Sequence, residues 1–219
     1  QSTYTQYYTQ RVIKHWIENF KIDGIRWDLT KGFTQNCNTQ DENCTNNYQQ
    51  DRVDILKSYA DYSWSLDENH YVIFEHLGGS NEEQQWANYR LNEGKGIMMW
   101  GKTNTPYYQL IMGYSANSNV SGIGPESRGF EGKRLLGYFE SHDEERVMYN
   151  ALQYGNNWDG YNIQDLNTSL SRMSAIGAIS LTIPGPKMIW HFSDLGMENS
   201  LFTCSDGTVN EPDCKLDTK

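Results

Sequence analysis

The stretch KIDGIRWDLTKGF, residues 21–33, places Arg26 and Asp28 two positions apart in what otherwise resembles a buried apolar strand. Residues 22–27, IDGIRW, predict a short β-strand, and Asp28 follows it directly. An unpaired charge is costly in a buried strand, so Arg26 and Asp28 need a partner. Side chains alternate along a strand, and these two residues, two positions apart, therefore share a face and can form an ion pair.

The same pattern of a helix followed by an apolar strand repeats along the chain. Near-continuous apolar strands separated by helices indicate a parallel sheet that is covered on both faces, which is an α/β fold. An open sheet and a closed barrel both fit this order, but the Gly-rich nucleotide signatures of the open sheet do not occur. The predicted helices are 5–20, 51–66, 81–92, 105–117, 144–154 and 167–180, and the predicted strands are 22–27, 71–76, 96–100, 134–141 and 186–192.

Composition narrows the class of protein. The 219 residues are 37% hydrophobic, which suits one domain with a real core. The net charge is -10 and no basic stripe occurs, so we expect no nucleic-acid partner. No apolar run is long enough to span a bilayer, so we expect no membrane partner. The chain begins at Gln1 without a leader, and we expect an internal piece of a soluble protein.

The four cysteines form two local pairs in polar loops. Cys37 and Cys44 close one short loop, and Cys204 and Cys214 close another. Two disulfides are the favoured interpretation, and they predict an oxidising compartment, either the periplasm or the extracellular medium. A metal site is the alternative, although neither spacing matches a zinc knuckle.

Three predicted strands are followed by acids, namely Asp28, Glu75 and Asp143. The carboxyl ends of parallel strands gather on one rim, where barrel enzymes carry their sites. Arg26 can keep Asp28 ionised beside other acids. Cleavage of a glycosidic bond with retention needs such a carboxylate, plus a protonated carboxyl group about 5–5.5 Å away. Glu75 suits the second role if an apolar strand end raises its pKa. Helix caps and surface ion pairs are the alternative explanation of these acids.

At this point the chain resembles the α-amylase family, glycoside hydrolase family 13. Residues 24–32, GIRWDLTKG, are similar to its segment Gly-Phe-Arg-x-Asp-x-x-Lys-His, and residues 72–78, VIFEHLG, to its strand that ends in a glutamate. Residues 139–143, FESHD, are similar to Phe-x-x-Asn-His-Asp, and residues 182–196 to the eighth strand and its loop. The resemblance implies a partial (β/α)8 TIM barrel, roughly its C-terminal five βα units.

The resemblance implies a role for each matched residue. Asp28 would be the nucleophile, Glu75 the general acid/base, and Asp143 the acid that stabilises the transition state. Arg26 would position Asp28 and contact the substrate site. The other predicted substrate-binding residues are Lys31, His142 and His76.

Several departures from the family pattern matter. Gly32 stands where the family has a His whose main chain often supports a calcium ion, which leaves a structural calcium open, and Ser141 replaces the usual Asn. The chemistry itself requires no cofactor. Over residues 1–219 we expect a partial catalytic barrel domain, without the first three strands, the inserted small domain or the C-terminal β-sandwich. Five strands cannot close an eight-stranded barrel, so the missing half is expected from the same polypeptide or a partner chain, and this chain alone should be inactive.

The predicted function is therefore retaining, endo-acting hydrolysis of α-1,4-glucosidic bonds in a starch-like polysaccharide or maltodextrin. Two alternatives within the family are an α-1,6-hydrolase and a transglycosylase. An alternative of another class is a glucan-binding homologue without catalytic activity.

Overall fold

The structure is a computed structural model, and it describes residues 1–38, 40–211 and 214. The chain divides into two compact units. The first unit consists of Gln1–Trp100 and Pro125–Leu136, and the second of Gly101–Gly124 and Gly137–Lys219. Each unit is described by itself. The prediction of one barrel domain over residues 1–219 stays a prediction.

A four-stranded sheet has the order β1-β2-β3-β4. The pairs β1/β2 and β2/β3 are parallel, with Trp27 opposite Phe74 and Ile73 opposite Met98. Helices separate the strands in the sequence, which confirms the predicted α/β fold of a partial barrel. The strands are β1 (Gly24–Trp27), β2 (Tyr71–Phe74), β3 (Met98–Lys102) and β4 (Leu135–Tyr138).

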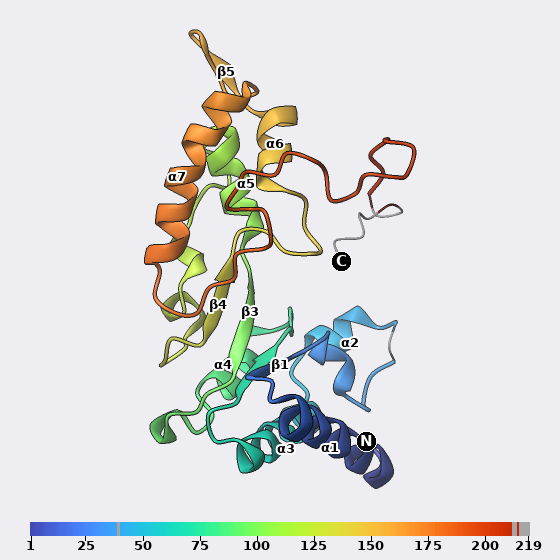
Figure 1. Cartoon of the computed structure of the whole chain (residues 1–219). Helices are drawn as coiled ribbons and strands as arrows, with labels where there is room; N and C mark the ends of the chain where they lie inside the picture. Colours follow the sequence, from blue (N-terminus) through green and yellow to red (C-terminus); the bar gives the residue numbers. More distant parts are fainter. Residues whose placement is uncertain (39, 212–213, 215–219) are drawn as a thin grey trace. The chain divides into compact units, whose positions relative to one another are not determined.

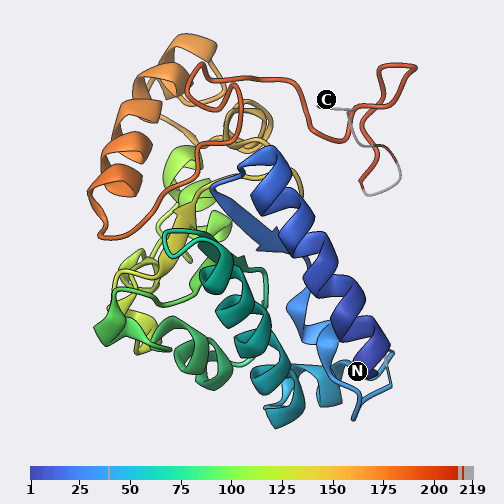
Figure 2. The same cartoon turned by 60° about the horizontal axis from the view of Figure 1, so that its bottom comes forward.

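The helices of the first unit cover its part of the sheet. Helices α1 and α3 lie side by side (Figures 1 and 2). Ser2 begins α1 by accepting a hydrogen bond from the Thr5 N–H, and Ile13 and Ile17 of this helix enter the core. The helices are α1 (Thr3–Phe20), α2 (Glu42–Asn46), α3 (Gln50–Leu66) and α4 (Ser80–Ala87), with 3-10 turns η1 (Thr30–Phe33), η2 (Leu91–Glu93) and η4 (Glu126–Arg128).

The second unit packs three helices around its own core (Figure 1). Phe139, at the end of β4, belongs to this core together with Ile111 and Ile176. No prediction covered the hairpin, whose turn places Asp159 and Gly160 at positive φ, as a two-residue hairpin loop requires. The elements are α5 (Asn104–Met112), α6 (Val147–Tyr154) and α7 (Leu166–Thr182), the hairpin β5 (Asn157–Trp158) and β6 (Tyr161–Asn162), and the 3-10 turn η3 (Ser121–Ile123).

The predicted fifth strand, 186–192, is wrong as a strand. It makes a single parallel bridge between Lys187 and Gly137, in which Gly137 N donates to Pro186 O at 3.0 Å and Met188 N donates to Gly137 O at 3.0 Å. A proline has no N–H to donate to a ladder, and the chain turns at His191, soon after the bridge.

Candidate active site

Asp28 and Glu75 follow two neighbouring parallel strands at the same edge of the sheet. Strand β1 ends at Trp27 and β2 at Phe74, and these two residues are paired in register. Glu75 N donates to Trp27 O at 3.0 Å, so the hydrogen bonds between the two strands continue as far as Glu75, the candidate acid/base residue. The register of the two strands therefore brings both candidate acids to one end of the first unit.

Arg26 connects the two carboxylates. Its Nη1 donates to Asp28 Oδ1 at 2.5 Å, and its Nη2 lies 2.8 Å from Glu75 Oε1, an ion-pair contact without hydrogen-bond alignment. The guanidinium carbon lies 4.9 Å from the centroid of the Trp100 ring, within range of a cation–π contact. Asp28 is 80% exposed, whereas Glu75 is 8% exposed. One cation thus contacts an accessible carboxylate and a buried one.

Leu29 supplies a second contact to Glu75. Its N–H donates to Glu75 Oε2 at 2.9 Å, and its backbone is left-handed, with φ 40° and ψ 59°. This conformation is uncommon and costly for a residue other than glycine, and it recurs at functional sites. Thr30 N then donates to Glu75 O at 2.7 Å. The Glu75 carboxylate is thus surrounded by polar donors and not by the apolar strand end that we expected.

His76, for which we predicted contact with the substrate, lies in the interior of the first unit, and that contact stays a prediction. Its side chain is fully buried, with Nε2 2.8 Å from Glu82 Oε2 and Nδ1 3.3 Å from the Thr30 hydroxyl. The ring also packs against Trp86, with centroids 4.8 Å apart. The side chain that follows Glu75 points into the interior, because successive residues of an extended segment face opposite sides.

Lys31 lies in η1, three residues after Asp28, and is half-buried. Its ammonium group donates to Asn46 Oδ1 at 3.3 Å, and its carbonyl accepts from Arg52. Arg52 therefore holds the main chain of Lys31, and the side chain of Lys31 reaches Asn46 at the end of α2. Its role toward a sugar stays a prediction.

The candidate residues of the second unit lie in the loop between β4 and α6. Strand β4 ends at Tyr138, so Asp143 lies within the loop and not at the strand end that we predicted. His142 Nε2 lies 3.1 Å from Asp143 Oδ2, and these side chains are 36% and 47% exposed. Ser141 Oγ accepts from Asp143 N at 3.1 Å, so the serine that replaces the family's asparagine supports this turn. The His142 ring packs against Trp190 at 5.6 Å.

Below this loop is a buried cluster that sequence analysis did not identify. The Glu140 carboxylate contacts Arg146 Nη1 at 3.0 Å, Val147 N at 2.7 Å and the Ser193 hydroxyl. Arg146 Nη1 also donates to His191 O at 2.8 Å. The only signal in the sequence was a Glu and an Arg on either side of the acidic run, which charge pattern alone does not distinguish from surface residues.

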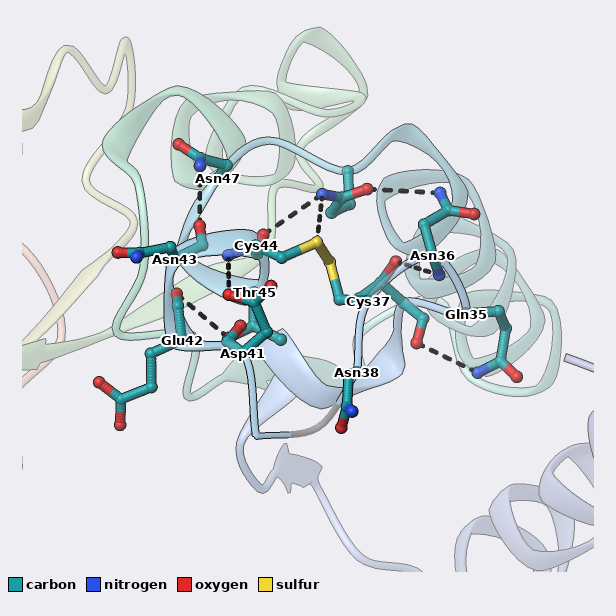
Figure 3. Close-up of a disulfide and its surroundings, with 12 residues drawn as sticks. Gln35, Asn36, Cys37, Asn38, Asp41, Glu42, Asn43, Cys44, Thr45 and Asn47 are labelled. Carbon is teal, nitrogen blue, oxygen red and sulfur yellow. Dashed lines mark hydrogen bonds between the residues drawn. A yellow bond between two sulfur atoms is a disulfide. The ribbon is translucent and has the colours of Figure 1, made fainter.

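Both predicted cysteine pairs are disulfides. The Cα atoms are 5.7 Å apart for Cys37–Cys44 and 5.0 Å for Cys204–Cys214. Figure 3 shows the first bond beside the start of α2, where Asp41 accepts from Cys44 N at 3.0 Å. The cysteines are bonded to one another, so the alternative of a cysteine metal site is wrong. Within the described ranges, no three His, Cys, Asp or Glu side chains are grouped to hold a metal ion.

No helix in the described part of the chain is both long and apolar enough to cross a membrane.

Comparison with known proteins finds no matching family model and no match among the curated proteins.

Solved structures do resemble the chain. Amy13B of Eubacterium rectale aligns with a TM-score of 0.62 and 13% identity, over 98% of this chain and 41% of that one. A pullulanase of Anoxybacillus sp. LM18-11, complexed with maltotetraose, aligns with a TM-score of 0.61 and 13% identity, over 94% of this chain and 28% of that one. An α-amylase of Geobacillus thermoleovorans, complexed with acarbose, gives 0.56 and 16%, over 89% and 37%.

The chain spans about two fifths or less of the length of these enzymes. At such identities the likeness concerns the fold. The chain has the fold of part of the α/β barrel found in α-amylase-type enzymes, which confirms the resemblance to a partial barrel of that family at the level of structure.

Proposed function

We propose that the chain is the C-terminal part of the catalytic barrel of a retaining α-glucan hydrolase of the α-amylase family. The observation that carries this proposal is the contact of one guanidinium, that of Arg26, with the carboxylates of both Asp28 and Glu75. A retaining glycosidase uses two carboxyl groups that lie close together, and these two follow neighbouring strands that are paired in register. The likeness of the fold to α-amylases and a pullulanase supports the same assignment.

In this proposal Asp28 attacks the anomeric carbon and forms a covalent glycosyl–enzyme, while Glu75 gives its proton to the leaving oxygen. Water then hydrolyses the intermediate, and Glu75 takes up the proton of that water. The high exposure of Asp28 leaves its free oxygen accessible to a sugar. Arg26 is a positioning residue, because its planar group reaches two carboxylates in a fixed geometry.

In the same proposal, Asp143 would be the acid that favours the distorted sugar of the transition state, and His142 would donate to sugar hydroxyls. Both side chains are partly exposed, and their mutual contact orients the imidazole. Lys31 would face a neighbouring sugar. No cofactor is required for these steps.

An apolar groove on the first unit supports the expectation that more of the barrel packs against this chain. The groove has a volume of about 370 Å³ beside α1 and β1. Val12, Trp16 and Phe20 of α1 are 38%, 45% and 58% exposed. We propose that the missing barrel half, from the same polypeptide or a partner chain, covers this surface, and that the 219 residues alone hydrolyse no starch.

The two disulfides favour an oxidising compartment, so the proposed site of action is the periplasm or the extracellular medium. The proposed substrate is a starch-like polysaccharide or maltodextrin that is cleaved internally at α-1,4 bonds. The similarity to a pullulanase keeps α-1,6 cleavage as the second candidate, and transglycosylation is a further activity of the same chemistry.

The test uses the complete protein and follows the anomer of the first product by proton NMR. Retention, with products from amylose, supports the proposal, whereas inversion contradicts the assignment of Asp28 as a nucleophile. Product profiles from amylose, pullulan and cyclodextrin separate α-1,4 hydrolysis, α-1,6 hydrolysis and transglycosylation. Binding of these glucans without any turnover would instead indicate a non-catalytic homologue.

A further inference from the structure

Two charged side chains of the first unit are completely buried. Arg52 of α3 and Glu82 of α4 are each 0% exposed, with Arg52 Nη2 2.5 Å from Glu82 Oε2 and Nε 2.9 Å from Oε1. Burial alone would raise the pKa of the Glu82 carboxyl, but hydrogen bonds from His76, Arg52 and the Gln49 N–H outweigh burial and lower it. Removing such charges from water is expensive, so a buried pair of this kind is weak evidence for stability and calls for another explanation.

The remaining donors of Arg52 all go to main-chain oxygens of one segment. Nη1 donates to Lys31 O and Thr45 O, and Nη2 donates to Asn47 O, each at 2.7 Å. A guanidinium has five N–H donors, and all five are used here. The cation therefore gathers three carbonyls from the two ends of the segment that contains α2 and the Cys37–Cys44 disulfide (Figure 3).

This arrangement of oxygens bears on the calcium ion that the resemblance to amylases implies. Calcium is held by carboxylates and main-chain carbonyls. Here three carbonyls and the Glu82 carboxylate instead all accept hydrogen bonds from the guanidinium of Arg52. The carbonyl of Lys31, one residue before Gly32, accepts from Arg52. The residues present therefore do not fit a calcium ion at this place.

We propose that Arg52 is the internal cation of the segment 31–47 and takes the place of a structural calcium ion there. It acts as a positioning residue. By holding Lys31 O, it fixes η1, whose Thr30 donates to Glu75 O through both its N–H, at 2.7 Å, and its hydroxyl, at 3.1 Å. The same cluster reaches Glu75 from the other side, because Glu82 contacts His76. The proposal rests on the proposed function only where it treats Glu75 as the acid/base residue and Lys31 as a residue that faces a sugar.

The first experiment measures thermal unfolding of the complete protein with excess EDTA and with millimolar Ca²⁺, together with hydrogen exchange of the amides in residues 31–49. The midpoint and the exchange of this segment should be the same in both solutions. Loss of protection in residues 31–49 on chelation would overturn the proposal, because a metal ion would then hold the segment.

The second experiment substitutes the cation. Arg52→Met removes the charge and every donor, and amides of residues 31–49 should exchange at least about tenfold faster. Arg52→Lys keeps the charge, so it should recover part of this protection. Arg128→Met is the matched control, because Arg128 pairs with Glu83 at 3.1 Å in the same unit and should leave the segment protected.

Equal exchange in Arg52→Met and Arg52→Lys, or unchanged exchange in both, would overturn the proposal. If Arg52→Met does not fold, the comparison of Arg52→Lys with the unaltered protein and with Arg128→Met still decides it. None of these measurements needs turnover, so their failure is distinguishable from failure of the proposed hydrolase function.

Discussion

The candidate acids lie in two units whose loops are supported in opposite ways. In the first unit, Arg52 is the centre, and a cation collects main-chain oxygens below Lys31 and Glu75. In the second unit, Glu140 is the centre, and an anion collects an arginine, a main-chain N–H and a hydroxyl below His142 and Asp143. A buried cation can thus fix a loop through its main-chain oxygens, and a buried anion can fix a loop through its main-chain N–H groups.

The candidate acids of the two units also differ in how firmly their side chains are held. Asp28 and Glu75 share a guanidinium that also packs on Trp100. Asp143 has its ion-pair contact with His142, and both side chains are partly exposed. We expect the first pair to be held in place before substrate arrives, and we expect the second pair to gain order from the sugar.

The largest effect should come from Glu75→Gln. General acid catalysis contributes about 10²–10⁴-fold, so kcat on amylose should fall by that factor in the complete protein. An aryl maltoside with a good leaving group needs no protonation and should be cleaved at nearly the normal rate in the first step. Glu126→Gln, at an exposed glutamate of η4, is the control. Equal losses on both substrates would contradict the assigned role of Glu75.

Removing the central charge of either buried cluster should be the next largest effect. Arg52→Met and Glu140→Gln each leave buried partners without compensation, and each should lower the free energy of unfolding by about 3–5 kcal/mol. Denaturant unfolding of the two variants measures this. A loss below about 1 kcal/mol for one of them would mean that its loop is supported by other contacts.

Arg26→Lys should affect catalysis more than stability. A lysine keeps the charge but cannot contact two carboxylates with a planar group. The loss of a charged hydrogen bond, about 1.5–3 kcal/mol, corresponds to about a 10–160-fold fall in kcat/KM. His142→Gln in the second unit should cost less, because its partner Asp143 is half exposed. The reverse order would show that the second unit holds the more tightly organised pair.

The smallest effect should be a change in how the free energy of unfolding depends on acidic pH. The folded pKa of Glu82 is lowered from 4.5, so its contribution to stability is present above that value and is lost as pH falls through the lower folded pKa. Burial raises the pKa of the neighbouring Glu83, so its contribution has the opposite sign. Glu82→Gln should therefore flatten the loss of stability in acid, and Glu83→Gln should steepen it, in denaturant midpoints measured from pH 7 down to below 4.5. Parallel curves for both variants would contradict this account.

Part of this structure was predictable from the sequence. Strands β1 and β2, with Asp28 and Glu75 directly after them, follow from apolar runs that end in charge. Both disulfides follow from short spacing in polar loops. These features are local, because neighbours along the chain determine them.

Features that depend on distant partners were missed. His76 is buried because it packs against Glu82 and Trp86 of α4, and periodicity does not identify such partners. Arg52 begins an ordinary helical pattern, and only the fold brings Lys31, Thr45 and Asn47 to it. The predicted strand at 186–192 was apolar enough, but Pro186 and the turn at His191 left it a single bridge.

The proposed mechanism requires that Asp28 forms a covalent bond with the sugar. The most direct measurement treats the complete protein with a fluorinated α-glucosyl fluoride, which forms the intermediate but slows its hydrolysis, and then locates the label by mass spectrometry of the peptides. We expect a labelled peptide that carries the sugar on Asp28, and no label in Asp28→Asn. A label on any other residue, or steady turnover to an inverted product without label, would contradict it.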